Sequence, residues 1–137
     1  MLAPLYHPAT RFAVGPRREI GIRTVFNILG PLTNPARVKG QVLGVADPSI
    51  APLMAAALGR MGVRHALVVS GCEGLDELSI AGPSLVCELR HGEFRSYEVT
   101  PEEVGLVRAP LAEVLGGTAE ENAAILRDVF TAPRSGA

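Results

Sequence analysis

Two short apolar runs in the middle of the chain predict buried β-strands. Val42–Ala46 and Ala66–Val69 consist almost wholly of apolar residues, a pattern typical of parallel strands covered on both faces. We therefore expect both segments to be central strands of a parallel sheet.

Apolar residues between the two runs recur with the period of an α-helix. Their spacing of i, i+3, i+4, i+7, i+8 and i+11 puts them on one helix face. This stripe consists of Ile50, Leu53, Met54, Ala57, Leu58 and Met61. Strand, helix and strand together predict a βαβ unit, which crosses over right-handedly in nearly all proteins and gathers ligands at the carboxyl ends of its strands.

Two alternating runs follow and predict a β-hairpin. The first covers residues 85–90 and the second contains Phe94, Tyr97 and Val99. Only His91 and Gly92 separate them, which is the length of a tight two-residue turn.

A last helix is predicted over residues 122–130. Thr118 and Glu121 have the spacing of a capping box ahead of it, and Ile125, Leu126 and Val129 share one of its faces.

The first third of the chain is punctuated by proline and glycine. We expect a short helix that begins near Pro16, where a missing N–H costs little, and ends at Gly21. Thr24–Leu29 predicts one further helical turn, after which the segment 30–35 is expected to be irregular.

Composition narrows the function classes. A chain of 137 residues with 47% hydrophobic and 20% charged residues is typical of one folded domain. A net charge of −1 without a basic stripe argues against nucleic acid as a partner.

No apolar run is long enough to span a bilayer, so we expect a cytoplasmic protein that does not bind membranes. Without a secretory signal, Cys72 and Cys87 are expected to be free thiols.

Two acids provide the first candidate chemistry. In Gly74–Leu78, Asp76 and Glu77 follow the apolar strand that ends at Val69, on the side of a parallel sheet where ligands bind. Adjacent carboxylates can supply oxygen ligands to Mg²⁺. The alternative is a pair of solvated loop acids.

Two further segments have both a functional and a structural interpretation. The rigid run Phe26–Pro35 is either a ligand-holding loop or a connector between layers. Arg17 and Arg18 could bind a carboxylate or phosphate, or could be exposed helical arginines. His7 is either structural or functional. The sequence contains neither a glycine-rich phosphate loop nor a zinc-type cysteine and histidine cluster.

Five ordered blocks of sequence resemble one enzyme family. They are Leu5–Ala9, Arg17–Thr24, Phe26–Pro35, Gln41–Val45 and Gly74–Leu78, with Ala66–Val69 and Glu121–Ala123 at similar spacing. Their order and spacing resemble anthranilate phosphoribosyltransferase along essentially the whole chain.

This resemblance implies transfer of phosphoribose from phosphoribosyl pyrophosphate (PRPP) to the amino group of anthranilate, which releases pyrophosphate, in tryptophan biosynthesis. It implies Mg²⁺ as cofactor, with Asp76 and Glu77 as metal ligands. Arg17, His7 and Pro31 match positions that bind anthranilate or line its channel. No residue of the chain is expected to act as a nucleophile, and the full-length family is expected to be homodimeric.

The expected fold is α/β, a parallel-sheet domain with a βαβ unit and a hairpin, preceded by a helical hinge segment. We assign residues 1–38 to the hinge and residues 39–137 to the α/β domain. The family's N-terminal helices, phosphate loop and final helices have no counterpart in the sequence, so a fragment inactive on its own is expected. A non-catalytic binding or oligomerisation module and a nucleoside-phosphorylase-like relative remain as alternatives.

Overall fold

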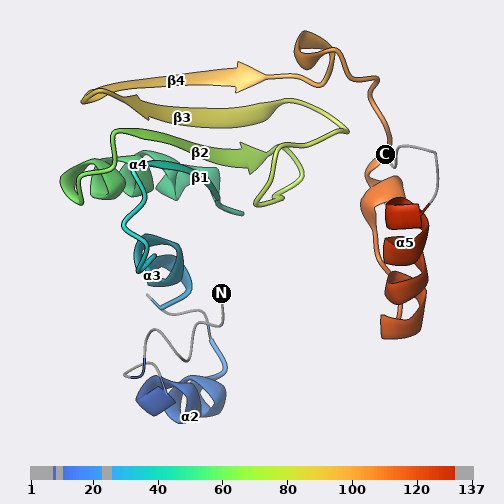
Figure 1. Ribbon diagram of the computed structural model, residues 1–137, viewed down its shortest axis with the longest axis horizontal. Helices are drawn as coiled ribbons and strands as arrows, with labels where there is room; N and C mark the ends of the chain where they lie inside the picture. Colours follow the sequence, from blue (N-terminus) through green and yellow to red (C-terminus); the bar gives the residue numbers. More distant parts are fainter. Residues whose placement is uncertain (1–7, 9–10, 23–25, 132–137) are drawn as a thin grey trace.

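The computed structural model describes residues 8, 11–22 and 26–131 (Figure 1). Its sheet consists of β1 (Gly40–Gly44), β2 (His65–Gly71), β3 (Ser84–Arg90) and β4 (Glu93–Val99). The α-helices are α2 (Arg11–Ile20), α3 (Phe26–Leu32), α4 (Ala51–Arg60) and α5 (Ala119–Thr131). Short 3-10 turns cover Pro48–Ile50, Glu102–Val104 and Leu111–Val114. The predicted α/β class is confirmed.

The four strands are ordered β1-β2-β3-β4. β1 and β2 are parallel and joined through α4, which confirms the βαβ unit. β2, β3 and β4 are antiparallel to their neighbours, so the sheet is mixed, and only its first pair is parallel as expected. Among the described strands β1 lies at an edge, and Val42 is 66% exposed, so the prediction of a central position is wrong for this strand.

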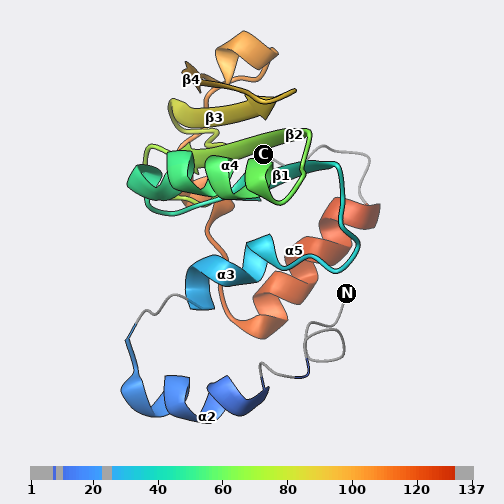
Figure 2. The same cartoon turned by 90° about the vertical axis from the view of Figure 1, so that its left-hand side faces the viewer.

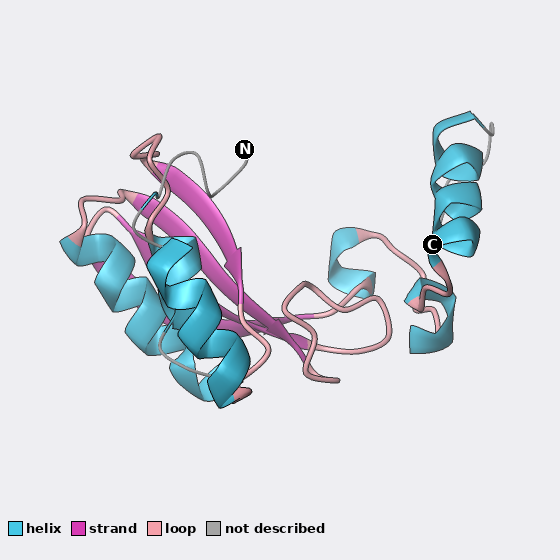
Figure 3. Ribbon diagram, turned by 90° about the horizontal axis from the view of Figure 1, so that it is seen from below, coloured by secondary structure: helices cyan, strands magenta, loops and turns pink. Residues whose placement is uncertain are grey.

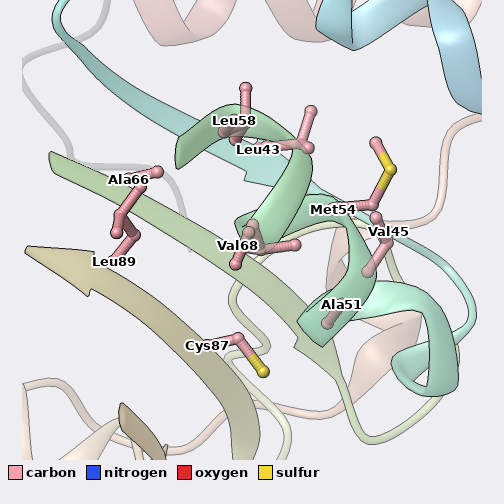
Figure 4. Close-up of a cluster of buried hydrophobic side chains, with 10 residues drawn as sticks. Leu43, Val45, Ala51, Met54, Leu58, Ala66, Val68, Cys87 and Leu89 are labelled. Atoms are coloured by element: carbon pink, nitrogen blue, oxygen red, sulfur yellow. The ribbon is translucent and has the colours of Figure 1, made fainter. Parts of the chain in front are cut away.

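Helix α4 covers one face of the sheet and forms the core with it (Figure 4). Leu43, Val68 and Leu89 meet Met54 and Leu58 of the helix there. The buried helical residues are Ala51, Met54, Ala55 and Leu58. Leu53 and Met61, which the sequence pattern put on the buried stripe, are 66% and 58% exposed. The helix is apolar on more than one face. The face that carries Ala51 and Ala55 is the one buried, because these small side chains allow the helix to lie close to the sheet.

The predicted hairpin is confirmed in its turn and register. Arg90 pairs with Glu93, which leaves exactly two residues in the turn. His91 and Gly92 both have positive φ, 51° and 88°, as a type I′ turn requires.

Both N-terminal helices extend through prolines at which the sequence pattern placed a boundary. α2 runs through Pro16 and α3 through Gly30 and Pro31. Each proline is the sixth residue of its helix, so its ring removes a single N–H from a short helix, and that loss is tolerated here. The predicted stop at Gly21 is confirmed by its φ of 66°.

The connection after α3 is held by local side-chain bonds. The Thr33 hydroxyl donates to the Gly30 carbonyl at 2.9 Å, and Asn34 Oδ1 accepts from the Ala36 N–H at 3.0 Å. Gln41 Nε2 donates to the Pro31 carbonyl at 3.1 Å and ties α3 to the first strand.

Helix α5 begins with the predicted capping box. The Thr118 N–H donates to Glu121 Oε2 at 2.7 Å, and the Glu121 N–H donates to Thr118 Oγ1 at 3.3 Å. α5 stands apart from the sheet (Figures 1 and 3), and its predicted shared face is about half exposed. No helix in the described ranges is long and apolar enough to cross a membrane.

Candidate functional site

The carboxyl ends of β1 and β2 lie at the same edge of the sheet because the two strands are parallel. The Val45 N–H donates to the Val69 carbonyl at 2.9 Å and extends the pairing beyond β1. β2 continues to Gly71 and then opens into the loop 72–83. The predicted acids Asp76 and Glu77 lie in this loop.

The loop is folded onto the end of β1 at a glycine. A Cβ atom added to Gly44 would overlap the carbonyl oxygen of Asp76. Only glycine lets the Asp76 peptide lie this close to the strand. The backbone that carries the acid is therefore positioned by the strand beneath it.

Backbone bonds fix the loop from within. The Gly71 N–H donates to the Leu75 carbonyl at 2.9 Å, and the Gly74 N–H donates to the Gly71 carbonyl at 3.0 Å. Gly74 has a φ of 79°, a conformation that suits glycine. These contacts form a tight turn directly before Asp76.

Buried serines hold the far end of the loop. Ser84 Oγ accepts from the Ser79 N–H at 2.8 Å, and Ser79 Oγ accepts from the Ala81 N–H at 3.0 Å. The Cys72 N–H donates to the Pro83 carbonyl at 3.1 Å. Both ends of the loop are thus closed by hydrogen bonds, with Asp76 and Glu77 between them.

Asp76 and Glu77 are exposed to solvent. Among the described residues neither carboxylate has a hydrogen-bond or ion-pair partner. No group of three or more metal-ligating side chains occurs in the described part of the chain. Carboxylate oxygens of this kind are ligands that Mg²⁺ takes in proteins together with water or substrate oxygens.

A third acid, Glu73, lies in the same loop. A hydrogen bond from the Cys72 thiol, reinforced by Ser79, lowers the pKa of Glu73 below its usual value, and the charge of Arg108 contributes. The bond to Glu73 likewise raises the pKa of the Cys72 thiol. Both thiols are free, as expected.

Arg108 reaches this edge on a returning segment. The Ala109 N–H donates to the Ile80 carbonyl at 3.0 Å, so the segment after β4 runs along the loop. Arg108 is paired with Glu102, with Nε 3.0 Å from Oε1. The sequence pattern did not single out Glu73 or Arg108, because their proximity depends on tertiary structure.

Of the other predicted site residues, the structure describes Pro31 and the backbone of Arg17. Arg17 is in α2, but its side chain is outside the described part of the structure, as is His7. α2 lies apart from the sheet and from loop 72–83 (Figures 1 and 2). Pro31 is exposed in α3. The described residues therefore unite Asp76 with Glu77 but bring neither α2 nor Pro31 to them.

The whole chain, residues 1–137, matches the sequence model of the glycosyl transferase family, a/b domain. An anthranilate phosphoribosyltransferase from Moorella thermoacetica is 55% identical over 134 residues, which are 98% of this chain and 40% of that protein. The chain thus spans about two-fifths of the length of the curated relatives it matches.

Two solved structures of anthranilate phosphoribosyltransferase from Saccharomyces cerevisiae have the same fold. One is in complex with 4-fluoroanthranilate and matches with a TM-score of 0.86 at 32% identity, over 96% of this chain and 38% of that one. The other is in complex with PRPP and Mg and matches with a TM-score of 0.79 at 32% identity, over 89% and 34%. Both similarities extend over most of the chain.

Proposed function

Because the chain belongs to the glycosyl transferase family, in the a/b domain that its full length matches, we propose that it serves anthranilate phosphoribosyl transfer. In this reaction the phosphoribose of PRPP moves to the amino group of anthranilate and pyrophosphate leaves. The observation that carries the proposal is the loop after β2, whose backbone rests on Gly44 and presents two unpartnered carboxylates.

The residues of this loop fit Mg²⁺. Asp76 and Glu77 supply hard oxygen donors, and Mg²⁺ is commonly held by one or two carboxylates together with water and substrate phosphates. A related yeast enzyme is described with PRPP and Mg. When bound, the metal offsets negative charge on the pyrophosphate group.

The fixed placement of the acids favours binding, because ordering a flexible loop when the ligand binds would cost conformational entropy and weaken the affinity. The turn at Gly71–Gly74 and the serine bonds at Ser79 and Ser84 hold the loop in place without a ligand.

We assign anthranilate binding to Arg17, His7 and Pro31. A guanidinium binds a carboxylate through two parallel hydrogen bonds and keeps its charge at any physiological pH. Arg17 is then a positioning residue, which holds the amine against the anomeric carbon of PRPP and accelerates the reaction through proximity. No protein nucleophile is needed in this scheme.

Calorimetry with separate ligands tests these assignments. We expect PRPP to bind in the presence of Mg²⁺, and Asp76→Asn with Glu77→Gln to weaken that binding at least tenfold, as loss of charge-assisted contacts would. Arg17→Gln should weaken anthranilate binding and leave Mg²⁺-dependent PRPP binding unchanged. The matched controls Asp128→Asn and Glu98→Gln remove exposed acids elsewhere.

The outcome separates the two classes of function. Metal-dependent PRPP binding that survives loss of both acids would overturn the assignment and favour a non-catalytic module.

A cytoplasmic location, a homodimer in the full-length protein and the division at residue 38 stay predictions.

A further inference from the structure

The opposite end of the sheet carries a basic hollow that the proposed function does not use. Residues from the end of α4 and from the β3–β4 turn line it, and its volume is about 650 Å³. Figure 1 shows that these two segments lie at the same end of the sheet. Its apolar lining includes Gly59, Leu89 and Phe94. Arg60, Arg64 and His91 line it as well. The size falls in the usual range for small-molecule sites.

Backbone bonds hold the basic residues around this hollow. The His91 N–H donates to the Arg64 carbonyl and the Arg64 N–H donates to the Lys39 carbonyl, both at 2.9 Å. Lys39 Nζ in turn donates to the Gly62 carbonyl at 3.3 Å. The backbones of three basic residues distant in the sequence therefore meet at one edge of the sheet, and two of these residues, Arg64 and His91, line the hollow.

The charge of this hollow is uncompensated. Among the described residues neither Arg60 nor Arg64 has an acidic partner, and no acid lines the hollow. The chain as a whole has a net charge of −1, so this concentration of positive charge is local. The carboxyl end of α4 offsets about half a unit charge near Arg60, which leaves an excess of positive charge.

Phe94 provides a flat apolar surface beside the cations. Its side chain is 57% exposed although it belongs to the hollow. A Cβ atom added to Gly59 would lie 3.5 Å from Phe94 Cζ and 3.2 Å from Leu89 Cδ2. The missing side chain of Gly59 therefore leaves room in which the ring packs against α4, while more than half of Phe94 stays exposed to solvent.

A second hollow of about 410 Å³ shares His91 and Phe94 with the first and adds Arg90. Arg95 also lines it but is paired with the buried Glu88 at 2.7 Å. Glu93 is the one acid that lines it. Phe94 thus lies between two hollows that both carry unpaired guanidinium groups.

We propose that this surface binds a nucleoside phosphate, with the base against Phe94 and Gly59 and the phosphates on Arg60 and Arg64. A planar base suits the exposed ring, since base–aromatic stacking does not depend on sequence. Two guanidinium groups carry more charge than one carboxylate can neutralise, whereas phosphates supply several acceptors and charges. The site lies at the amino end of β2 and the carboxyl end of β3, away from Asp76 and Glu77, and does not depend on the proposed function.

Titration of the ¹⁵N-labelled chain with ATP, without Mg²⁺, tests the proposal. We expect shifts concentrated on the amides of Gly59, Gly62 and Gly92, with saturation in the submillimolar range that weakens as salt is added. Arg60→Gln and Arg64→Gln should each raise Kd roughly fivefold, as expected for exposed charge pairs. Phe94→Leu should raise it by a similar factor through lost stacking.

Controls separate this site from the loop acids. Arg127→Gln removes an exposed arginine on α5, and Asp76→Asn removes a proposed metal ligand; both should leave ATP binding unchanged. The spectra of the free variants report whether each is folded. Absence of shifts at millimolar ATP, or a Kd unaffected by the arginine variants, would overturn the proposal. Tripolyphosphate binding as tightly as ATP would overturn the assigned role of the base.

Discussion

At the scale of single residues, close backbone contacts decide where the candidate site lies. The adjacent acids were visible in the sequence as possible Mg²⁺ ligands, and they are exposed at the edge where parallel strands end. The role of Gly44 was not visible in the sequence. A glycine within an apolar run does not reveal which distant peptide packs against it in the folded chain. The contact with Asp76 exists only in the folded chain.

Gly44→Ala tests this contact. The new methyl group would collide with the Asp76 carbonyl, which is backbone and cannot swing away. We expect the loop to be displaced, with Mg²⁺-dependent PRPP binding weakened at least tenfold and stability lowered by about 1–3 kcal/mol. Gly15→Ala is the control, because an added Cβ there meets nothing within 4 Å. Equal effects of the two variants would contradict the proposed role of Gly44.

Glu88 gives a second residue-scale prediction. It is 4% exposed and accepts bonds from Arg95 Nε at 2.8 Å and from the Tyr97 hydroxyl at 3.1 Å, with His65 Nε2 2.9 Å away. The Arg95 bond is the largest cause that lowers the pKa of Glu88, against the opposing effect of burial. Its stabilising effect should be present above the unfolded pKa of about 4.5 and lost as pH falls through the lower folded pKa.

Glu88→Gln should therefore lower the unfolding free energy at pH 7 by about 1–3 kcal/mol, since partners of a buried charge are left poorly satisfied. Chemical denaturation between pH 3 and 7 should show a smaller loss of stability on acidification than in the wild type. An unchanged acid dependence would show that this carboxylate does not link folding to pH.

At the scale of elements, the sequence pattern predicted the strand–helix–strand unit, the hairpin turn and the capping box. It misplaced the buried face of α4, because the helix is apolar on several sides and packing against the sheet selects among them. The sequence pattern also ended α3 too early and began α2 too late. Both helices continue through a proline, because a short helix tolerates the loss of one backbone N–H.

Two leucines on α4 test which face is buried. Leu58 is 1% exposed and Leu53 is 66% exposed. Leu58→Ala should lower the free energy of unfolding by about 2–5 kcal/mol because it leaves a cavity in the core. Leu53→Ala should change it by less than about 0.5 kcal/mol. If both variants lost a similar amount of unfolding free energy in urea denaturation, Leu58 would not be the buried leucine of α4.

At the scale of the whole molecule, acidic and basic side chains lie at opposite ends of one sheet. Acids gather at the carboxyl ends of β1 and β2, and arginines gather at the amino ends. This separation could not be predicted from a net charge of −1, because composition does not record which residues the topology brings together. The family could be identified from the sequence because the motif Asn27–Pro35 is long and specific and the shorter blocks occur in the same order as in the family.

The most direct test of the central claim replaces Mg²⁺ by paramagnetic Mn²⁺ and records amide signals of the labelled chain with PRPP present. Binding by Asp76 and Glu77 predicts selective broadening of loop 72–83 and of the residues around Gly44, abolished by Asp76→Asn with Glu77→Gln. Broadening centred elsewhere, or unchanged in that double variant, would contradict a metal site at the carboxyl edge of the sheet.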